Sequence, residues 1–127
     1  MARAILLDTD VLVDFLRGYK KAVTFVEAKA SRIVLSSIVV AELYAGVKGD
    51  SDQRALENLV SLFRVIPVTA AIAKAGGIYR SVYGKSHGVG LADAIIAATS
   101  EIENADLKTL NVKHYPMIKG LRPVYTK

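Results

Sequence analysis

Short runs of consecutive apolar residues alternate with longer stretches of helical periodicity, and this alternation constrains the fold more than any other feature. The first run, residues 4–7, contains no polar side chain and stops at Asp8. Such uninterrupted runs are typical of parallel strands that are buried on both faces. Further strands are expected at 33–35, 65–66 and 107–110, and an edge strand containing Pro123 at 121–125. The pattern predicts an α/β fold with a mainly parallel sheet covered by helices on both faces.

Capping residues and glycines mark where the intervening helices begin and end. Asp8 and Asp10 offer N-cap oxygens at the start of one helix, and Ser36 or Ser37 at the start of another. Thr69 opens a long helix whose apolar face is predicted to comprise Ile72, Ala75, Tyr79, Val82 and Tyr83. The expected helices are 11–17, 20–30, 37–48, 50–63, 69–83 and 91–104, with a loop over 84–90.

The bulk properties of the chain limit the classes of protein to which it can belong. Its 127 residues show no linker or repeat, so we expect a single domain over 1–127. The longest apolar stretch, 33–47, is too short to span a bilayer, and no targeting segment is visible, so a cytoplasmic protein without membrane contact is expected. With no cysteine, any metal site must use oxygen or imidazole ligands. The net charge of +5 favours a polyanionic partner such as nucleic acid.

Three acidic residues occur where solvated side chains are not expected. Asp8 follows directly on the first apolar run, where ligands bind in parallel sheets, and it is alternatively a helix N-cap. Glu42 lies in a helix that is apolar nearly all round, so burial on most sides is expected, with an ion pair to a distant Arg or Lys as the alternative. Asp93 lies in the first turn of an apolar helix, where N-terminal capping is the alternative.

One shared divalent cation explains these three carboxylates together. No Lys or Arg lies within one helical turn of Glu42 or Asp93, so neither acid has a local counter-charge. Ligands that supply only oxygen indicate a hard cation, Mg²⁺ or Mn²⁺. Carboxylate-bound Mg²⁺ commonly serves phosphodiester cleavage. Together with the basic charge, the pattern predicts a metal-dependent nuclease.

Four segments that contain these residues, LLDTDVL (6–12), SIVVAELYAG (37–46), LADAIIAA (91–98) and TLNVKHY (109–115), resemble those of a known family. In this order and spacing the chain resembles a PIN domain, specifically the VapC toxins of bacterial and archaeal toxin–antitoxin pairs. The resemblance implies a three-layer α/β/α fold. It also implies an endoribonuclease that cleaves RNA, commonly tRNA or rRNA, forms a homodimer and is blocked by a cognate VapB-type antitoxin.

By the same resemblance, the catalytic metal ligands fall on Asp8, Glu42 and Asp93. The fourth acidic position of the family falls on Asn111, which can lend a carbonyl oxygen or hold a metal-bound water but brings no charge, and which is alternatively a turn residue. Secondary roles beside the metal ligands are expected for Thr9, Asp10 and Ser37. Helix capping is the alternative role for Asp10 and for Ser37.

Basic and aromatic residues give weaker indications of RNA binding. The candidates for contacting RNA phosphates include Arg80, Lys85 and Lys113, although a solvated surface explains them equally well. His87 and His114 are expected in loops, as solvated or phosphate-contacting groups. Stacking on an unpaired base is an option for Tyr19 and Tyr115.

Two other functions compete with the nuclease. The Asp8-Thr9-Asp10 segment after an apolar strand resembles the nucleophile of haloacid-dehalogenase phosphatases, but that function leaves Glu42 unexplained. A non-catalytic PIN-like domain that binds RNA or protein is the main non-enzyme alternative. Degenerate members usually lose an acidic ligand, whereas three acids are present here.

Overall fold

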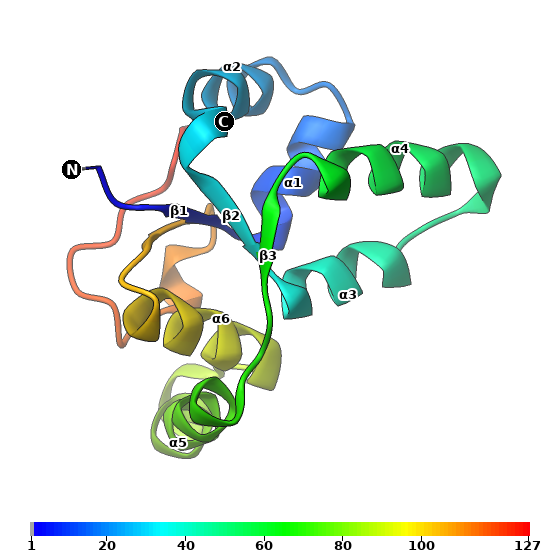
Figure 1. Ribbon diagram of the computed structural model, residues 1–127. Helices are drawn as coiled ribbons and strands as arrows, with labels where there is room; N and C mark the ends of the chain where they lie inside the picture. The colour runs from blue at the N-terminus through cyan, green and yellow to red at the C-terminus, as the bar shows by residue number, and fades with distance from the viewer. Residues whose placement is uncertain (1) are drawn as a thin grey trace.

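A computed structural model describes residues 2–127 and shows a four-stranded sheet between two layers of helices (Figure 1). The strands lie in the order β3-β2-β1-β4, and every neighbouring pair is parallel. The prediction of a three-layer α/β/α fold with a parallel sheet is therefore confirmed. The strands are β1 (Ile5–Leu7), β2 (Ile33–Ser36), β3 (Arg64–Ile66) and β4 (Asp106–Lys108).

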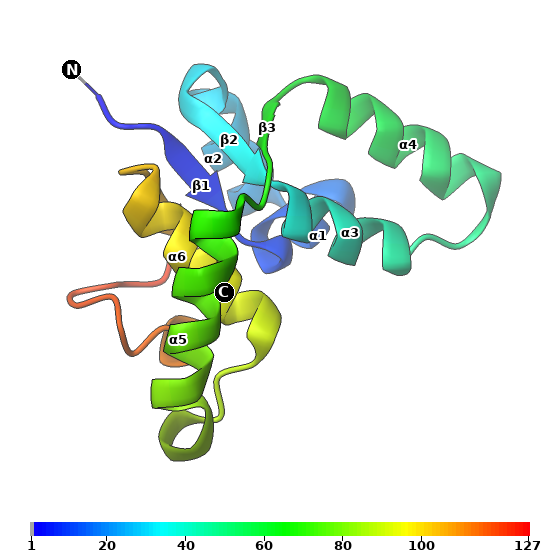
Figure 2. The ribbon, with the colours of Figure 1, turned by 60° about the horizontal axis from the view of Figure 1, so that its bottom comes forward.

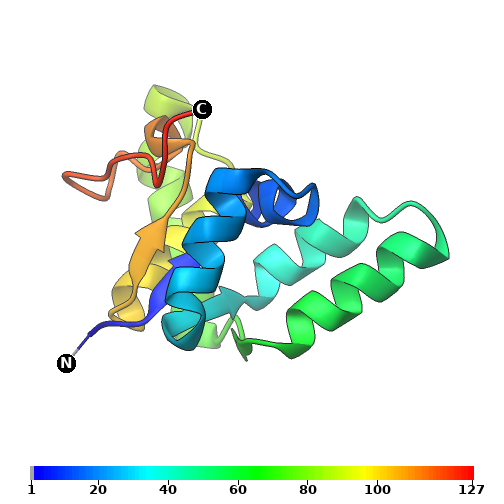
Figure 3. The ribbon, with the colours of Figure 1, turned by 90° about the horizontal axis from the view of Figure 1, so that it is seen from above.

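The helices divide between the two faces of the sheet. Helices α1 and α2 cover one face and α5 and α6 the other (Figure 1), with α5 and α6 packed along each other (Figure 2). Helices α3 and α4 form a hairpin that extends away from the sheet (Figure 3). The bounds are α1 (Thr9–Leu16), α2 (Lys20–Lys29), α3 (Ser37–Ala45), α4 (Gly49–Ser61), α5 (Ala70–His87) and α6 (Leu91–Ile102), with short 3-10 turns η1 (Ala30–Arg32) and η2 (Val112–His114).

The central strand β1 is buried completely, as its apolar run predicts. Ile5, Leu6 and Leu7 are at most 1% exposed, and Leu6 pairs with Val34 on one side and with Leu107 on the other. Because all strands run in the same direction, the residues that follow β1 and β4 emerge at one edge of the sheet. The sheet thus brings chain segments about a hundred residues apart to a common end.

Two helix ends differ from the expected ones. Helix α3 ends at Ala45, with Gly46 as its C-cap, and does not reach residue 48. Helix α5 continues through the expected loop to His87 and ends at Gly88, which adopts the left-handed conformation (φ 64°). A helix C-terminus favours glycine in that conformation, so Gly88 and not Gly84 is the stop signal. Val82 was expected on the buried face of this helix, but it is 59% exposed.

The C-terminal part of the chain also departs from the prediction. Strand β4 covers 106–108 and not 107–110, and 121–125 forms no strand. This segment is instead joined to the end of β4 by a hydrogen bond from the Val124 amide to the Thr109 carbonyl (3.0 Å). Pro123 has no amide hydrogen to donate to a ladder, which limits strand pairing there. Within residues 2–127 no helix is both long enough and apolar enough to cross a membrane.

Candidate active site

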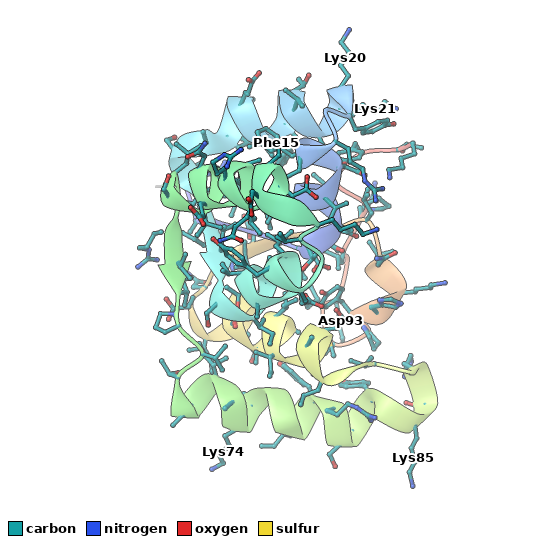
Figure 4. All side chains as sticks on the ribbon, turned by 90° about the vertical axis from the view of Figure 1, so that its right-hand side faces the viewer. Phe15, Lys20, Lys21, Lys74, Lys85 and Asp93 are labelled. Carbon is teal, nitrogen blue, oxygen red and sulfur yellow. The ribbon has the colours of Figure 1, made fainter. Side chains whose placement is uncertain are left out.

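A pocket of about 290 Å³ lies at the carboxyl end of β1 and brings the predicted acids together. Its walls come from the start of α1, from α3, from the first turn of α6 and from the turn after β4. Figure 4 shows Asp93 at the start of α6, where that helix faces α3 and the segment around η2. The lining residues are Asp8, Thr9, Asp10, Glu42, Asp93, Asn111 and His114.

Asp8 is the most buried acid of the pocket. It is 5% exposed and is the N-cap of α1, and its Oδ1 accepts a hydrogen bond from the Thr9 amide (2.8 Å). Its Oδ2 accepts from the hydroxyls of Thr109 (2.8 Å) and Tyr115 (2.7 Å). The capping alternative is therefore correct, and it is compatible with a place in the site because only Oδ1 contacts the helix amide, while Oδ2 contacts Thr109 and Tyr115.

Glu42 lines the pocket from α3, but the expectation that its side chain is buried on most sides is wrong. Residues 41, 42, 44 and 45 of α3 are all exposed, because this helix packs through the face that carries Val39 and Leu43. Glu42 Oε1 accepts a hydrogen bond from the Thr9 hydroxyl (2.7 Å). No ion pair between residues 2–127 involves Glu42, so the alternative of a distant Arg or Lys partner is also wrong.

Desolvation and like charge act together on the Glu42 carboxyl. Its pKa is raised above the ordinary value, first by desolvation and then by repulsion from Asp8 and Asp93, while the Thr9 hydrogen bond opposes the shift. The three acids therefore lie within electrostatic range of one another.

Asp93 occupies the first turn of α6 and is half-buried. Its hydrogen bonds go to other segments and not to its own helix, since Oδ1 accepts from the Tyr115 hydroxyl (3.3 Å) and Oδ2 lies 3.2 Å from Nδ1 of His114. Burial, followed by repulsion from Asp8, raises the pKa of Asp93, and contacts with His114 and Tyr115 oppose this rise. Capping of α6 by the Asp93 side chain is thus not observed.

Asp10 lies behind Asp8 and joins α1 to the turn after β4. Its Oδ2 accepts hydrogen bonds from the Leu110 amide (2.9 Å) and the Thr109 hydroxyl (3.3 Å), and its Oδ1 accepts from the Val11 amide (2.8 Å). Burial and then the charge of Asp8 raise its pKa. Asp8 occupies the N-cap position, but Asp10 also satisfies a first-turn amide of α1, so both roles considered for Asp10 are observed: its Oδ1 caps the Val11 amide and its Oδ2 holds the turn that follows β4.

The other residues with predicted secondary roles have different outcomes. Thr9 contacts Glu42 as expected. Ser37 is outside the pocket and does not cap α3: its Oγ accepts from the Val68 amide (3.1 Å), while Ser36 is the N-cap. The expectation for Ser37 is therefore wrong, because the side chain points toward the segment after β3. Asn111 lines the pocket and precedes η2, and its role stays a prediction.

The candidate RNA contacts lie on two different elements. Arg80 and Lys85 are exposed on α5 (Lys85 in Figure 4), whereas Lys113 is exposed in η2, next to the pocket. No observation tests their binding of RNA. Base stacking by Tyr115 is excluded because this residue is 1% exposed, and the ring of Tyr19 lies 5.7 Å from that of Tyr125.

Sequence reasoning missed Thr109 at the site and expected other roles for His114 and Tyr115. Thr109 follows a parallel strand directly, as Asp8 does, but the strand was expected to continue to Leu110, so only the structure shows that Thr109 lies just beyond the end of β4. His114 was expected to be a solvated or phosphate-contacting loop residue, yet its ring contacts Asp93. Nothing in the local sequence indicates that Tyr115 is buried with its hydroxyl on two carboxylates.

The chemistry of the donor set fits a hard divalent cation. Four carboxylates and an amide line one pocket, and the only basic side chain in an ion pair with any of the four, among residues 2–127, is His114. In the same part of the chain, no three His, Asp or Glu side chains are close enough to hold an ion in these conformations. Their oxygens instead accept hydrogen bonds from Thr9, Thr109 and Tyr115. Metal binding at Asp8, Glu42 and Asp93 therefore stays a prediction.

Comparison with known proteins agrees with this fold. The model of the family described as PIN domain matches residues 5–115. The chain is 37% identical over 124 residues to ribonuclease VapC10 of Mycobacterium tuberculosis, covering 95% of this chain and 92% of the relative. It is 40% identical over 124 residues to ribonuclease VapC19 of the same species, covering 94% and 98%.

Two solved structures extend the similarity to three dimensions. A toxin–antitoxin complex from Klebsiella pneumoniae contains a chain of 28% identity with a TM-score of 0.81, covering 96% of this chain and 98% of that one. VapBC2 from Rickettsia felis, bound to a DNA fragment from its promoter, contains one of 27% identity with a TM-score of 0.76, covering 93% and 95%. The fold, the matched family model and the full-length relatives lead to one conclusion: this chain belongs to the PIN-domain family and, within it, to the VapC group.

Proposed function

We propose that this chain is an endoribonuclease toxin that requires Mg²⁺ or Mn²⁺ and uses Asp8, Glu42 and Asp93 as catalytic metal ligands. The observation that carries the proposal is the convergence of these carboxylates, from three distant segments, on one pocket without a Lys or Arg partner. Groups that raise one another's pKa by repulsion are stabilised by a shared cation. The names of the full-length relatives, which are ribonucleases, support RNA as the substrate.

The pocket residues and a bound ion would have different roles in cleavage of the phosphodiester. A bound divalent ion would supply Lewis-acid stabilisation of phosphate charge and an acidified water. The Thr9 hydroxyl orients Glu42, and the three donors on Asp8 fix its carboxylate. Lys113, exposed beside the pocket, is placed to attract an RNA phosphate.

The proposal includes partners that similar proteins have. The solved structures similar to this chain include toxin–antitoxin complexes, which supports inhibition by a VapB-type antitoxin. Homodimerisation is also proposed, and it would bury apolar side chains such as Ile78 and Val82, which are 53% and 59% exposed on α5. We propose tRNA or rRNA as the target and the cytoplasm as the location, because both RNAs are found there.

Cleavage of purified tRNA and rRNA in the presence and absence of a chelator tests the activity. The wild type should cut only with Mg²⁺ or Mn²⁺, and Glu42→Gln and Asp93→Asn should each reduce the rate by at least about a hundredfold while far-UV circular dichroism is unchanged, since each removes a charge that the ion requires. Lys74→Gln, on the exposed surface of α5 (Figure 4), is the matched control and should cut normally. A wild-type rate for Glu42→Gln would show that the ligand assignment is wrong.

The same assay separates the alternatives. A non-catalytic PIN-like domain would bind RNA or protein but leave the RNA intact with every metal. The haloacid-dehalogenase-like phosphatase is disfavoured by membership of the PIN-domain family. Sequencing the RNA ends produced after expression without antitoxin would identify the RNA and the cleavage site.

A further inference from the structure

Tyr115 joins two of the three acids through a single hydroxyl group. It follows η2 directly, is 1% exposed and belongs to the hydrophobic core. Its hydroxyl lies 2.7 Å from Asp8 Oδ2 and 3.3 Å from Asp93 Oδ1. A phenol has one proton to donate, so it donates mainly to Asp8, with Asp93 as the more distant acceptor.

We propose that Tyr115 is a positioning residue for metal binding, whose hydroxyl holds Asp8 and Asp93 at a fixed separation and orientation. This inference rests on the proposed metal-dependent function, because it assigns the group that prepares the two carboxylates for the ion. Tyr115 itself is neither a ligand nor a group that touches the RNA.

The physical reason lies in the repulsion between the two acids. Asp8 and Asp93 come from segments 85 positions apart, on α1 and α6, and no Lys or Arg forms an ion pair with either among residues 2–127. Without a common donor, repulsion favours rotamers that turn the carboxylates apart. A hydroxyl shared by both opposes this rotation, and the burial of the ring fixes the position of the hydroxyl. An ion that meets carboxylates already oriented by hydrogen bonds loses less binding energy to ordering them.

The hydroxyl can be removed while the ring that positions it stays in place. The ring fills the core, and phenylalanine would fill it equally, so Tyr115→Phe removes the bridge with little change in packing. A second tyrosine offers a matched control: the Tyr125 hydroxyl donates to Asp14 Oδ2 at 2.7 Å, and Asp14 is 6% exposed. Asp14 does not line the pocket. Tyr125→Phe therefore removes the same type of hydrogen bond to a buried carboxylate outside the proposed metal site.

Titration of the purified full chain with Mn²⁺, followed by calorimetry and by the electron paramagnetic resonance of free Mn²⁺, tests the inference. We expect Tyr115→Phe to raise the Kd for Mn²⁺ by about tenfold or more, the range typical of groups that orient metal ligands, and Tyr125→Phe to leave it within about twofold. Saturating Mn²⁺ should restore most of the RNA cleavage of Tyr115→Phe. Far-UV circular dichroism at the titration temperature verifies that both variants are folded.

Equal Mn²⁺ affinities for the wild type and Tyr115→Phe would overturn this inference alone. An equal loss of affinity in both tyrosine variants would also overturn it, because the effect would then be one of general stability. Absence of Mn²⁺ binding by the wild type would overturn the proposed metal dependence together with this inference. Loss of the fold in Tyr115→Phe would also overturn the inference, because removal of the hydroxyl alone would then have shown that its role is structural.

Discussion

Replacing Asp93 by asparagine should make the metal-free protein more stable, although it removes a charge from the proposed site. Asp8 Oδ2 and Asp93 Oδ1 both lie within 3.3 Å of the Tyr115 hydroxyl, so the two oxygens are at most about 6 Å apart. At an effective dielectric constant of about 20, two unit charges at about 6 Å repel by about 3 kcal/mol. This repulsion disappears in Asp93→Asn.

Two losses offset part of that gain. The anion in the first turn of α6 interacts favourably with the helix dipole, by about 0.3–1 kcal/mol. The hydrogen bonds from Tyr115 and His114 also weaken when their acceptor becomes neutral, by about 1 kcal/mol in total. The net expectation is about 1 kcal/mol of added stability, or about 3 °C in Tm for a domain of this size.

The pH dependence of this gain has a defined sign. The pKa of Asp93 is raised in the folded protein, so folding favours the protonated form of the side chain. Below the unfolded pKa of 3.8 the side chain is protonated in both states, so its charge does not affect the stability of the fold. The destabilisation by the charge develops above that pH and is complete once the pH exceeds the raised pKa of the folded protein. The Tm advantage of Asp93→Asn in chelator should therefore be small near the acid limit and largest near neutral pH.

Calorimetric melting of both proteins in chelator, at about pH 4.5 and about pH 7.5, measures the effect. The control is Asp50→Asn, the same substitution in the first turn of α4 but at an exposed residue outside the pocket, which should not raise Tm. The reasoning is refuted if Asp93→Asn melts below the wild type at the higher pH, or if the difference between the two is the same at both pH values.

Two further predictions concern single contacts. Thr9→Val keeps the shape of the side chain but removes the hydroxyl that donates to Glu42. It should lower the rate of RNA cleavage by about tenfold, as loss of a charge-assisted hydrogen bond would, while the circular dichroism spectrum stays unchanged. Full activity of this variant would show that Glu42 needs no orientation by Thr9. Gly76→Ala should destabilise the fold by about 1–3 kcal/mol in denaturant titration, because its Cβ would lie 2.8 Å from Ile95 Cγ1 where α5 crosses α6. At the neighbouring Gly77 a Cβ would meet nothing within 4 Å, so Gly77→Ala should leave the stability unchanged or raise it by about 0.5–1 kcal/mol. Equal changes in the free energy of unfolding for the two variants would contradict the packing argument.

The sequence predicts the central strand and several of the acids that line the pocket. The apolar run before Asp8 predicts a buried parallel strand, and β1 is that strand. Acids without a local basic partner, at Glu42 and Asp93, indicate a common pocket, and both line it. These inferences succeed because hydrophobic periodicity is a local property, and because residues that follow the strands of a parallel sheet all emerge at the same edge.

Local patterns failed where several readings were compatible with them. A loop was expected from Gly84, but α5 continues to His87 and ends at Gly88. The apolar sequence of α3 suggested burial of Glu42 on most sides, but only one face of this helix packs against the domain. An apolar sequence permits the burial of a helix, whereas the elements that pack against the helix determine how much of its surface is buried.

The sequence by itself determined the parallel α/β architecture and indicated acids that meet at the carboxyl end of β1. Only the tertiary structure decided which groups support those acids, namely the hydroxyls of Thr109 and Tyr115, which reach Asp8 from 101 and 107 positions away. The physical reason is that a hydrogen bond depends on atomic distance and direction, to within a few tenths of an ångström, and these are set only when the whole chain has packed.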